Sequence, residues 1–206
     1  MLRLLAKVPV IKNKTKILIS FSLLVLALTL SILHPQAIDY KLCFYAMIFS
    51  FLGDISLNAL PIEKRSHTLL YTGAFFFMIS HLIYAQAYIS LNLPFAFFNF
   101  GFYFAFGLML ILISISLISI KKSRKTVSSS TLLVFSIYAL MISINFISIY
   151  SYSWNFKALS FIGATSFLIS DYIIGIETIL KIKNDVLRKL VWIFYPIGQI
   201  MILVCR

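Results

Sequence analysis

The sequence predicts an all-α fold: a polytopic transmembrane helix bundle of about seven spans, forming a single transmembrane domain over residues 1–206. Of the 206 residues, 61% are hydrophobic and only 12% are charged, and the mean hydropathy is +1.00. Soluble domains have about 45–50% apolar and about 25% charged residues. A chain of this length has room for seven or eight spans of about 20 residues with short connections, which leaves nothing for a soluble domain.

The predicted spans are apolar runs bounded by charged or turn residues. The first run follows Lys16 and lacks a small-residue cleavage site, so we expect it to remain as a span and not to be removed as a signal peptide. The fourth run is longer than a bilayer requires, which indicates a tilted helix or one that begins at the membrane interface near Asn92. In chain order, the runs cover residues 17–33, 40–60, 69–90, 95–120, 131–150, 158–180 and 189–205.

The net charge of +12 is explained by topology, because the basic residues fall on one side of the seven predicted spans. Fifteen of the 18 Lys and Arg residues lie before the first span, in the connections after the second, fourth and sixth spans, or at the first residue of the seventh span, and the other three are Lys41, Lys157 and Arg206. The positive-inside rule then places the N-terminus in the cytoplasm and the C-terminus outside. The charge therefore reflects topology and does not indicate nucleic-acid binding, and contact of the basic residues with membrane lipid headgroups is the ordinary condition of cytoplasmic loops.

Two carboxyl groups, Asp54 and Asp171, lie deep inside apolar runs. A charged side chain at the centre of a membrane helix costs about 2.5 to 3.5 kcal/mol on insertion scales, so such residues indicate a functional site. At about 1.5 Å per residue, Asp54, His81, Asp171 and Gln199 all fall within about 5 Å of the middle of their spans. Four polar groups from four helices are therefore predicted to lie at nearly the same depth in the membrane.

Helical spacing adds further polar residues to the faces that carry these groups, because residues three or four apart share one side of a helix. Packing offers a simpler explanation of some of them: Asp54 could hydrogen-bond to His81 and fix the helix register, and Gln199 or Asn145 could join helices by a contact worth about 0.6 kcal/mol. One deep histidine with two aspartates is a poor zinc ligand set, so we expect no metal or other cofactor. The neighbouring polar residues are Ser50, Asn58, Tyr84, Ser170 and Tyr195.

These residues stand in an order that resembles the YhhN-type lysoplasmalogenases, multi-pass hydrolases of the vinyl ether bond in lysoplasmalogens. The resemblance covers most of the chain, although the family is usually drawn with eight spans and Pro196 replaces an expected aromatic residue. It is carried by Ser50-Phe-Leu-Gly-Asp54, by Gly73, Phe77, His81 and Tyr84, by Gly163-Ala164 with Phe167 and Ser170-Asp171, and by Tyr195 with Gln199.

The resemblance implies a hydrolase with a lysophospholipid substrate. The Ile-, Lys- and Phe-rich composition is compatible with a bacterial inner membrane. A vinyl ether is cleaved by protonation of its β-carbon, after which water captures the oxocarbenium ion and the hemiacetal expels an aldehyde. This route needs a protonated carboxyl group and a nearby carboxylate, as in glycosidases. We expect Asp54 and Asp171 to be the acid and the base in an unassigned order, with His81 orienting a carboxylate or water.

The remaining polar residues would bind the oxygen-rich end of the lipid: Ser50, Asn58, Tyr84, Ser170, Tyr195 and Gln199. Two other functions fit the same cluster. In a small proton-coupled transporter or lipid-binding membrane protein, Asp54, His81 and Asp171 would relay protons or hold a ligand. In a structural membrane protein, they would only lock helices together.

Overall fold

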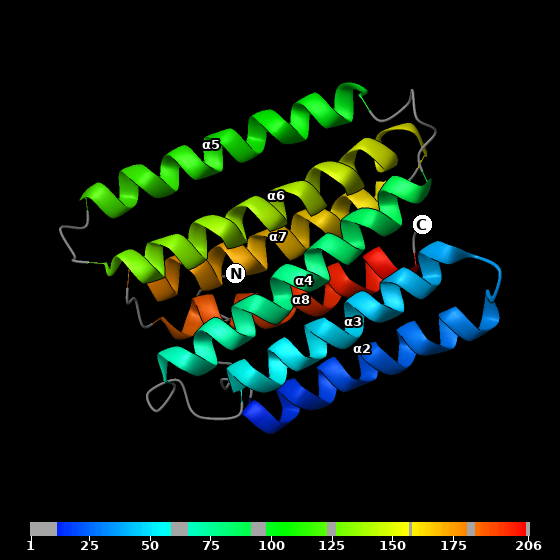
Figure 1. The fold of residues 1–206 in the computed structure, drawn as a ribbon, viewed down its shortest axis with the longest axis horizontal. Coiled ribbons are helices and arrows are strands. Elements are labelled where there is room, and N and C mark those ends of the chain that lie inside the picture. Colours follow the sequence, from blue (N-terminus) through cyan, green and yellow to red (C-terminus); the bar gives the residue numbers. More distant parts are fainter. Residues whose placement is uncertain are drawn as a thin grey trace.

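The computed structural model describes residues 12–58, 66–91, 98–122, 127–156, 158–180 and 184–204. These residues form seven α-helices and consecutive helices run antiparallel, so the chain passes along the bundle seven times (Figure 1). The all-α prediction is confirmed. The helices are α2 (Asn13–Leu33), α3 (Ile38–Asn58), α4 (His67–Leu91), α5 (Phe100–Lys122), α6 (Ser129–Phe156), α7 (Ala158–Ile179) and α8 (Asp185–Val204).

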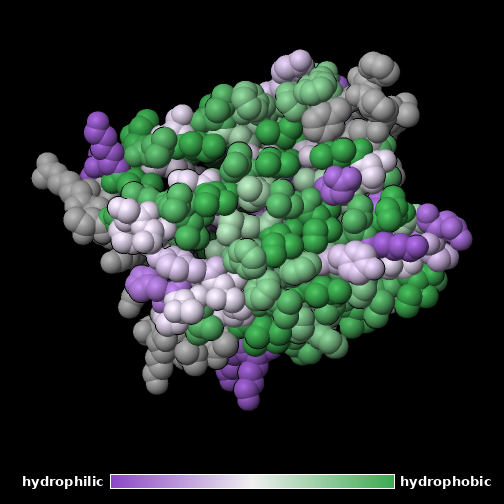
Figure 2. All heavy atoms as spheres, in the orientation of Figure 1, coloured by the Kyte–Doolittle hydropathy of each residue, from purple (hydrophilic) through white to green (hydrophobic). Residues whose placement is uncertain are grey.

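Each of the seven helices is long and apolar enough to cross a membrane. Large hydrophobic side chains are exposed on the outside of the bundle, and hydrophobic residues cover most of the face seen in Figure 2. The protein is therefore a multi-pass membrane protein. The placement of the N-terminus in the cytoplasm stays a prediction from the charge distribution.

The observed helix ends differ from the predicted ones most clearly at the starts of α2 and α5. Helix α2 begins at Asn13 and includes Lys14 and Lys16, because lysine side chains can extend from a helix end to the membrane surface. Helix α5 begins at Phe100, where the side chain of Asn99 accepts the backbone N–H of Phe102 at 3.1 Å and caps the helix. The predicted residues 59–60, 95–97 and 205 lie outside the described residues.

Six helices form a closed ring and α5 lies outside it. Around the ring, α2 packs on α3, α3 on α4, α4 on α6, α6 on α7, α7 on α8 and α8 on α2, whereas α5 packs on α6 (Figure 1). The buried residues of α5 are Gly101, Ala105 and Met109, which share one face and lie in the first half of the helix. The second half of α5 is therefore held less closely by the bundle.

Helices α7 and α8 touch through their backbones at Gly163 and Gly198. A Cβ atom added to Gly198 would lie 2.7 Å from the backbone nitrogen of Phe167 and 3.0 Å from the carbonyl oxygen of Gly163. Such small-residue contacts allow close helix approach in membranes. They fix α7, which carries Asp171, against α8, which carries Gln199.

Candidate active site

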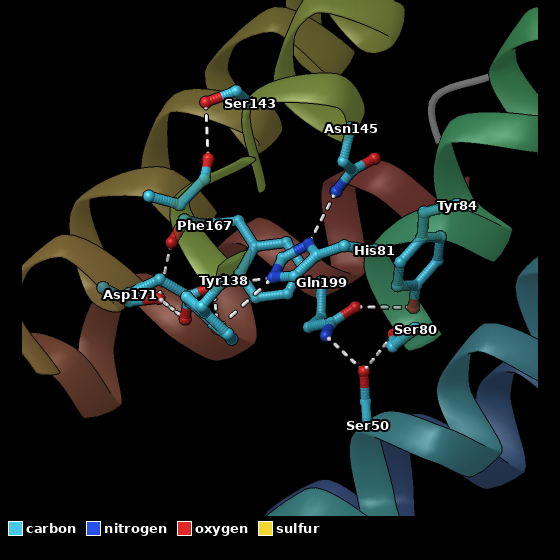
Figure 3. Close-up of polar contacts among 12 residues, drawn as sticks. Ser50, Ser80, His81, Tyr84, Tyr138, Ser143, Asn145, Phe167, Asp171 and Gln199 are labelled. Atoms are coloured by element: carbon cyan, nitrogen blue, oxygen red, sulfur yellow. Dashed lines mark hydrogen bonds and ion pairs between the residues drawn. The ribbon is translucent and has the colours of Figure 1, made fainter. Parts of the chain in front are cut away.

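The first polar cluster surrounds Asp171 and joins α4, α6 and α7 (Figure 3). Its Oδ2 atom lies 3.0 Å from Nε2 of His81 and accepts the hydroxyl of Tyr138 at 3.0 Å. Nε2 of His81 also lies 3.3 Å from the Tyr138 hydroxyl, and the two rings meet edge to face with centroids 5.6 Å apart. Asp171 is 6% exposed and His81 is fully buried, so the imidazole, the phenol and the carboxyl group form one compact unit.

Asn145 on α6 fixes the other side of the His81 ring. Its amide nitrogen Nδ2 donates to Nδ1 of His81 at 3.0 Å. In this orientation of the amide, Nδ1 is the acceptor and the ring hydrogen lies on Nε2, so Nε2 donates to Asp171. The arrangement Asn145–His81–Asp171 thereby sets both the tautomer and the direction of the imidazole.

Ser170 contacts the second carboxyl oxygen of Asp171. Its hydroxyl donates to the backbone carbonyl of Phe167 at 2.7 Å, and its oxygen lies 3.4 Å from Oδ1 of Asp171. A hydroxyl has one hydrogen, and the shorter contact with Phe167 uses it. The Ser170 oxygen can then accept a hydrogen bond from Oδ1 when Oδ1 carries a proton.

Asp54 belongs to a separate cluster, formed by α2, α3 and α8. Its Oδ2 atom accepts the hydroxyls of Tyr195 at 2.6 Å and of Ser20. Asn58, one turn further along α3, donates its side-chain amide to the backbone carbonyl of Asp54 at 2.9 Å. Asp54 is 4% exposed, so its carboxyl group is enclosed by its own hydrogen-bond partners.

A third cluster joins α3, α4 and α8 through Gln199. The hydroxyl of Tyr84 donates to Oε1 of Gln199 at 2.7 Å, and Nε2 of Gln199 donates to the hydroxyl oxygen of Ser50 at 3.4 Å (Figure 3). Ser50 and Ser80 share a further hydrogen bond of 2.7 Å. All four side chains are fully buried, so the polar groups of this cluster bind one another.

Phe167 connects the clusters by ring contacts. Its ring centroid lies 5.1 Å from that of His81, 5.7 Å from that of Tyr195 and 6.4 Å from that of Tyr84. Phe167 thus touches a hydrogen-bond partner of each aspartate, while no hydrogen bond joins Asp54 directly to Asp171 among the described residues.

An apolar cavity of about 800 Å³ runs between α5, α6 and α7, and Asp171 and Tyr138 are part of its wall. This volume lies within the range of about 300–1,000 Å³ that is usual for ligand sites. Asp54 and His81 do not line it. The lining is otherwise mostly hydrocarbon, so of the two deep aspartates it is Asp171 that faces space for an apolar ligand.

In the structure, the polar residues that were predicted to lie at one depth form three separate clusters. His81 pairs with Asp171 and not with Asp54, and Tyr195 and Gln199 fall into different clusters. Tyr138 and Ser20 were not predicted as site residues. A signal for Tyr138 was present, since it lies seven residues before Asn145 and two helical turns place both on one face of α6.

Within the described ranges, no group of three or more His, Cys, Asp or Glu side chains is arranged to hold a metal ion.

Comparison with known proteins identifies the family. No curated protein and no solved structure matches the chain. The model of the YhhN family matches residues 12–205, which cover all seven helices. The resemblance of the sequence is thus confirmed, and the chain belongs to the YhhN family.

Proposed function

We propose that this protein is an intramembrane hydrolase that cleaves the vinyl ether bond of lysoplasmalogens. Characterised members of the YhhN family are lysoplasmalogenases. The observation that carries the proposal is the position of Asp171, which is held by His81 and Tyr138 in the wall of a large apolar cavity. A carboxyl group that faces space for a hydrocarbon chain suits acid catalysis on a lipid.

The reaction begins with Asp171 as a general acid. The carboxyl proton passes to the β-carbon of the vinyl ether, and the double-bond electrons form the new C–H bond, which leaves an oxocarbenium ion beside the Asp171 carboxylate. Because Oδ2 already accepts hydrogen bonds from His81 and Tyr138, the transferable proton is assigned to Oδ1, where Ser170 can hold it. The hydrogen bonds to Oδ2 strengthen as the carboxylate forms.

The same carboxylate then acts as the base. It takes a proton from water as the water oxygen attacks the oxocarbenium carbon, which restores the acid and gives a hemiacetal. Transfer of the hemiacetal hydroxyl proton to the ether oxygen breaks the carbon–oxygen bond and releases a fatty aldehyde and the glycerophospho-headgroup. The sum is one vinyl ether and one water converted to one aldehyde and one alcohol.

Asp54 is proposed to act as a positioning residue and not as the second reacting carboxyl group. It is enclosed by Ser20 and Tyr195, and it does not line the cavity. Its contact with the reacting groups passes through Tyr195 and Phe167 to His81. We likewise propose that Ser50, Asn58, Tyr84 and Gln199 hold the helices around the site, because their polar groups bind other protein groups.

The test is release of fatty aldehyde from an alkenyl lysophospholipid by the purified protein. The wild type should release aldehyde, Asp171→Asn should release none while remaining folded, and a saturated alkyl ether lysolipid should be untouched because it lacks the double bond. In heavy water, rapid reduction of the product should trap one deuterium on the carbon next to the aldehyde carbon. No aldehyde from the wild type, as a transporter or structural protein predicts, would refute the proposal.

A further inference from the structure

On α5 and α6 the lining of the apolar cavity extends further on one side of Asp171 than on the other, whereas on α7 it continues mainly toward the shorter side, from Asp171 to the end of the helix. Tyr138 contacts Asp171, so the two residues mark one level. On α6 the lining continues from Tyr138 to Ser148 on one side and to Leu132 on the other, which corresponds to about 15 Å and about 9 Å at 1.5 Å per residue. On α5 it reaches Phe102 at the far end of the long side.

The long arm matches the length of one lipid chain. A bilayer has a hydrocarbon core about 30 Å thick, so the chains of one leaflet span about 15 Å. The wall of this arm is formed by apolar side chains of α5 and α6, including Phe106, Met109 and Ile147. One extended hydrocarbon chain that starts at the level of Asp171 would therefore fill it.

The short arm leads to a basic helix end. Ser116 on α5 donates to the hydroxyl of Tyr172 at 3.4 Å, which places it near the level of Asp171. Lys121 and Lys122 follow in the last turn of α5, about 7.5 Å and about 9 Å further along at 1.5 Å per residue, and both are exposed. In a lysolipid only the glycerol backbone separates the ether oxygen from the phosphate, so a phosphate near these lysines leaves the ether bond near Asp171.

We infer that the cavity between α5, α6 and α7 binds a phosphate-bearing single-chain lipid in one direction, with its phosphate at Lys121 and Lys122 and the free end of its chain toward Phe102. This inference rests on the proposed function and assigns the substrate its place in the site. Apolar lining selects the chain, and the two ammonium groups select the phosphate.

Photo-crosslinking tests the direction of the chain. The probe is a saturated alkyl ether lysophosphatidylcholine with a diazirine on the last carbon of its chain, which the wild-type protein cannot hydrolyse. After irradiation and peptide mapping, label is expected in residues 100–110 and 142–148, at the end of the long arm. Label at residues 117–122, or label spread over the outer faces of all helices, would overturn the inference.

Two glycines, one in the cavity wall and one outside it, test whether the probe occupies the cavity. A Cβ atom added to Gly175 or to Gly107 meets no atom within 4 Å, but Gly175 lines the cavity and Gly107 does not. Gly175→Phe should reduce labelling by the probe at least tenfold, whereas Gly107→Phe should leave it within twofold of wild type. Equal labelling of both folded variants, judged by their thermal unfolding in detergent, would overturn the inference.

Removal of the two lysines tests the phosphate site. Lys121→Gln combined with Lys122→Gln should weaken probe capture about 25-fold, since each lysine near a lipid phosphate contributes about fivefold. Lys12→Gln combined with Lys14→Gln removes two exposed lysines at the N-terminal end of α2 and should not weaken capture. An alkylglycerol probe without phosphate should bind both double variants equally, and equal capture of the phosphate probe would contradict the inference.

The outcomes separate this inference from the proposed reaction. Directional labelling without aldehyde release from an alkenyl lysolipid would support the binding site and refute the hydrolase. Aldehyde release without directional labelling would support the hydrolase and overturn this placement of its substrate.

Discussion

Removal of the Tyr138 hydroxyl is the sharpest single test of the proposed reaction. Tyr138→Phe deletes the oxygen that donates to Oδ2 of Asp171 at 3.0 Å and lies 3.3 Å from Nε2 of His81. The ring stays in place, so its edge-to-face contact with the His81 ring is kept. The change therefore removes the hydrogen bond to the reacting carboxyl group together with the weaker contact to His81, and it leaves the ring packing intact.

The expected loss follows from the strength of that bond. A hydrogen bond to a charged group contributes about 1.5–3 kcal/mol, and each 1.36 kcal/mol in the barrier is a factor of ten in rate. If the bond is fully expressed once the carboxylate forms, kcat falls by about 10-fold to 150-fold. KM should change little, because an interaction that strengthens after substrate binding acts on the transition state and less on the bound ground state.

The assay is steady-state release of fatty aldehyde from an alkenyl lysolipid in detergent, with kcat and KM determined separately. Tyr71→Phe is the matched control, since the Tyr71 hydroxyl forms one 3.0 Å hydrogen bond with Thr131 and joins α4 and α6, the helices that carry His81 and Tyr138. The control should keep kcat within about twofold of wild type, because it loses a single neutral hydrogen bond away from the cavity. If Tyr138→Phe and Tyr71→Phe had the same kcat, the role assigned to the Tyr138 hydroxyl would be wrong.

Three other changes probe the surroundings of the reacting group. Asp54→Asn should lower aldehyde release about tenfold through weaker hydrogen bonds to its partners, and inactivity as complete as that of an Asp171 variant would instead indicate that Asp54 reacts. Asn145→Leu should free Nδ1 of His81 and allow the other tautomer, which ¹⁵N NMR of histidine-labelled protein detects; an unchanged spectrum and rate would contradict this. Gly198→Ala should cost about 1–3 kcal/mol of stability by overpacking, so its unfolding temperature in detergent should fall below that of Gly107→Ala, and equal temperatures would speak against close backbone contact.

The spans could be predicted from the sequence because hydropathy and length depend on the membrane and not on the neighbours of a helix. Hydropathy also held information on the position of α5. Helices α5 and α2 have the highest mean hydropathy, 2.4 and 2.3, and the smallest buried shares, 11% and 17%. Lipid-facing helices need no polar contacts within the protein, so these values indicated which helices lie at the edge.

The sequence predicted how deep in the membrane the site residues lie, but not which of them are neighbours. Counting residues placed Asp54, His81, Asp171 and Gln199 at one level, but the rotation and order of the helices decide which of them meet. The ring in which α4 neighbours α6 brings His81 to Asp171, while α8 brings Tyr195 to Asp54. Tyr138 was missed because an aromatic residue in an apolar run is usually a packing residue. Its spacing from Asn145 indicates a shared face of α6 but not the carboxylate on another helix.

Because α5 is attached loosely, the helices that hold the reacting groups differ from the helix that forms one wall of the cavity. Helices α4, α6 and α7 hold the acid and its partners, and the contact at Gly163 and Gly198 ties α7 to α8. Helix α5 supplies one wall of the cavity but no partner of Asp171 among the described residues. Substitution of the α5 residues that line the cavity by larger or smaller ones should therefore change which lipid chain lengths are accepted. The proton transfer at Asp171, on the opposite wall, should be unaffected.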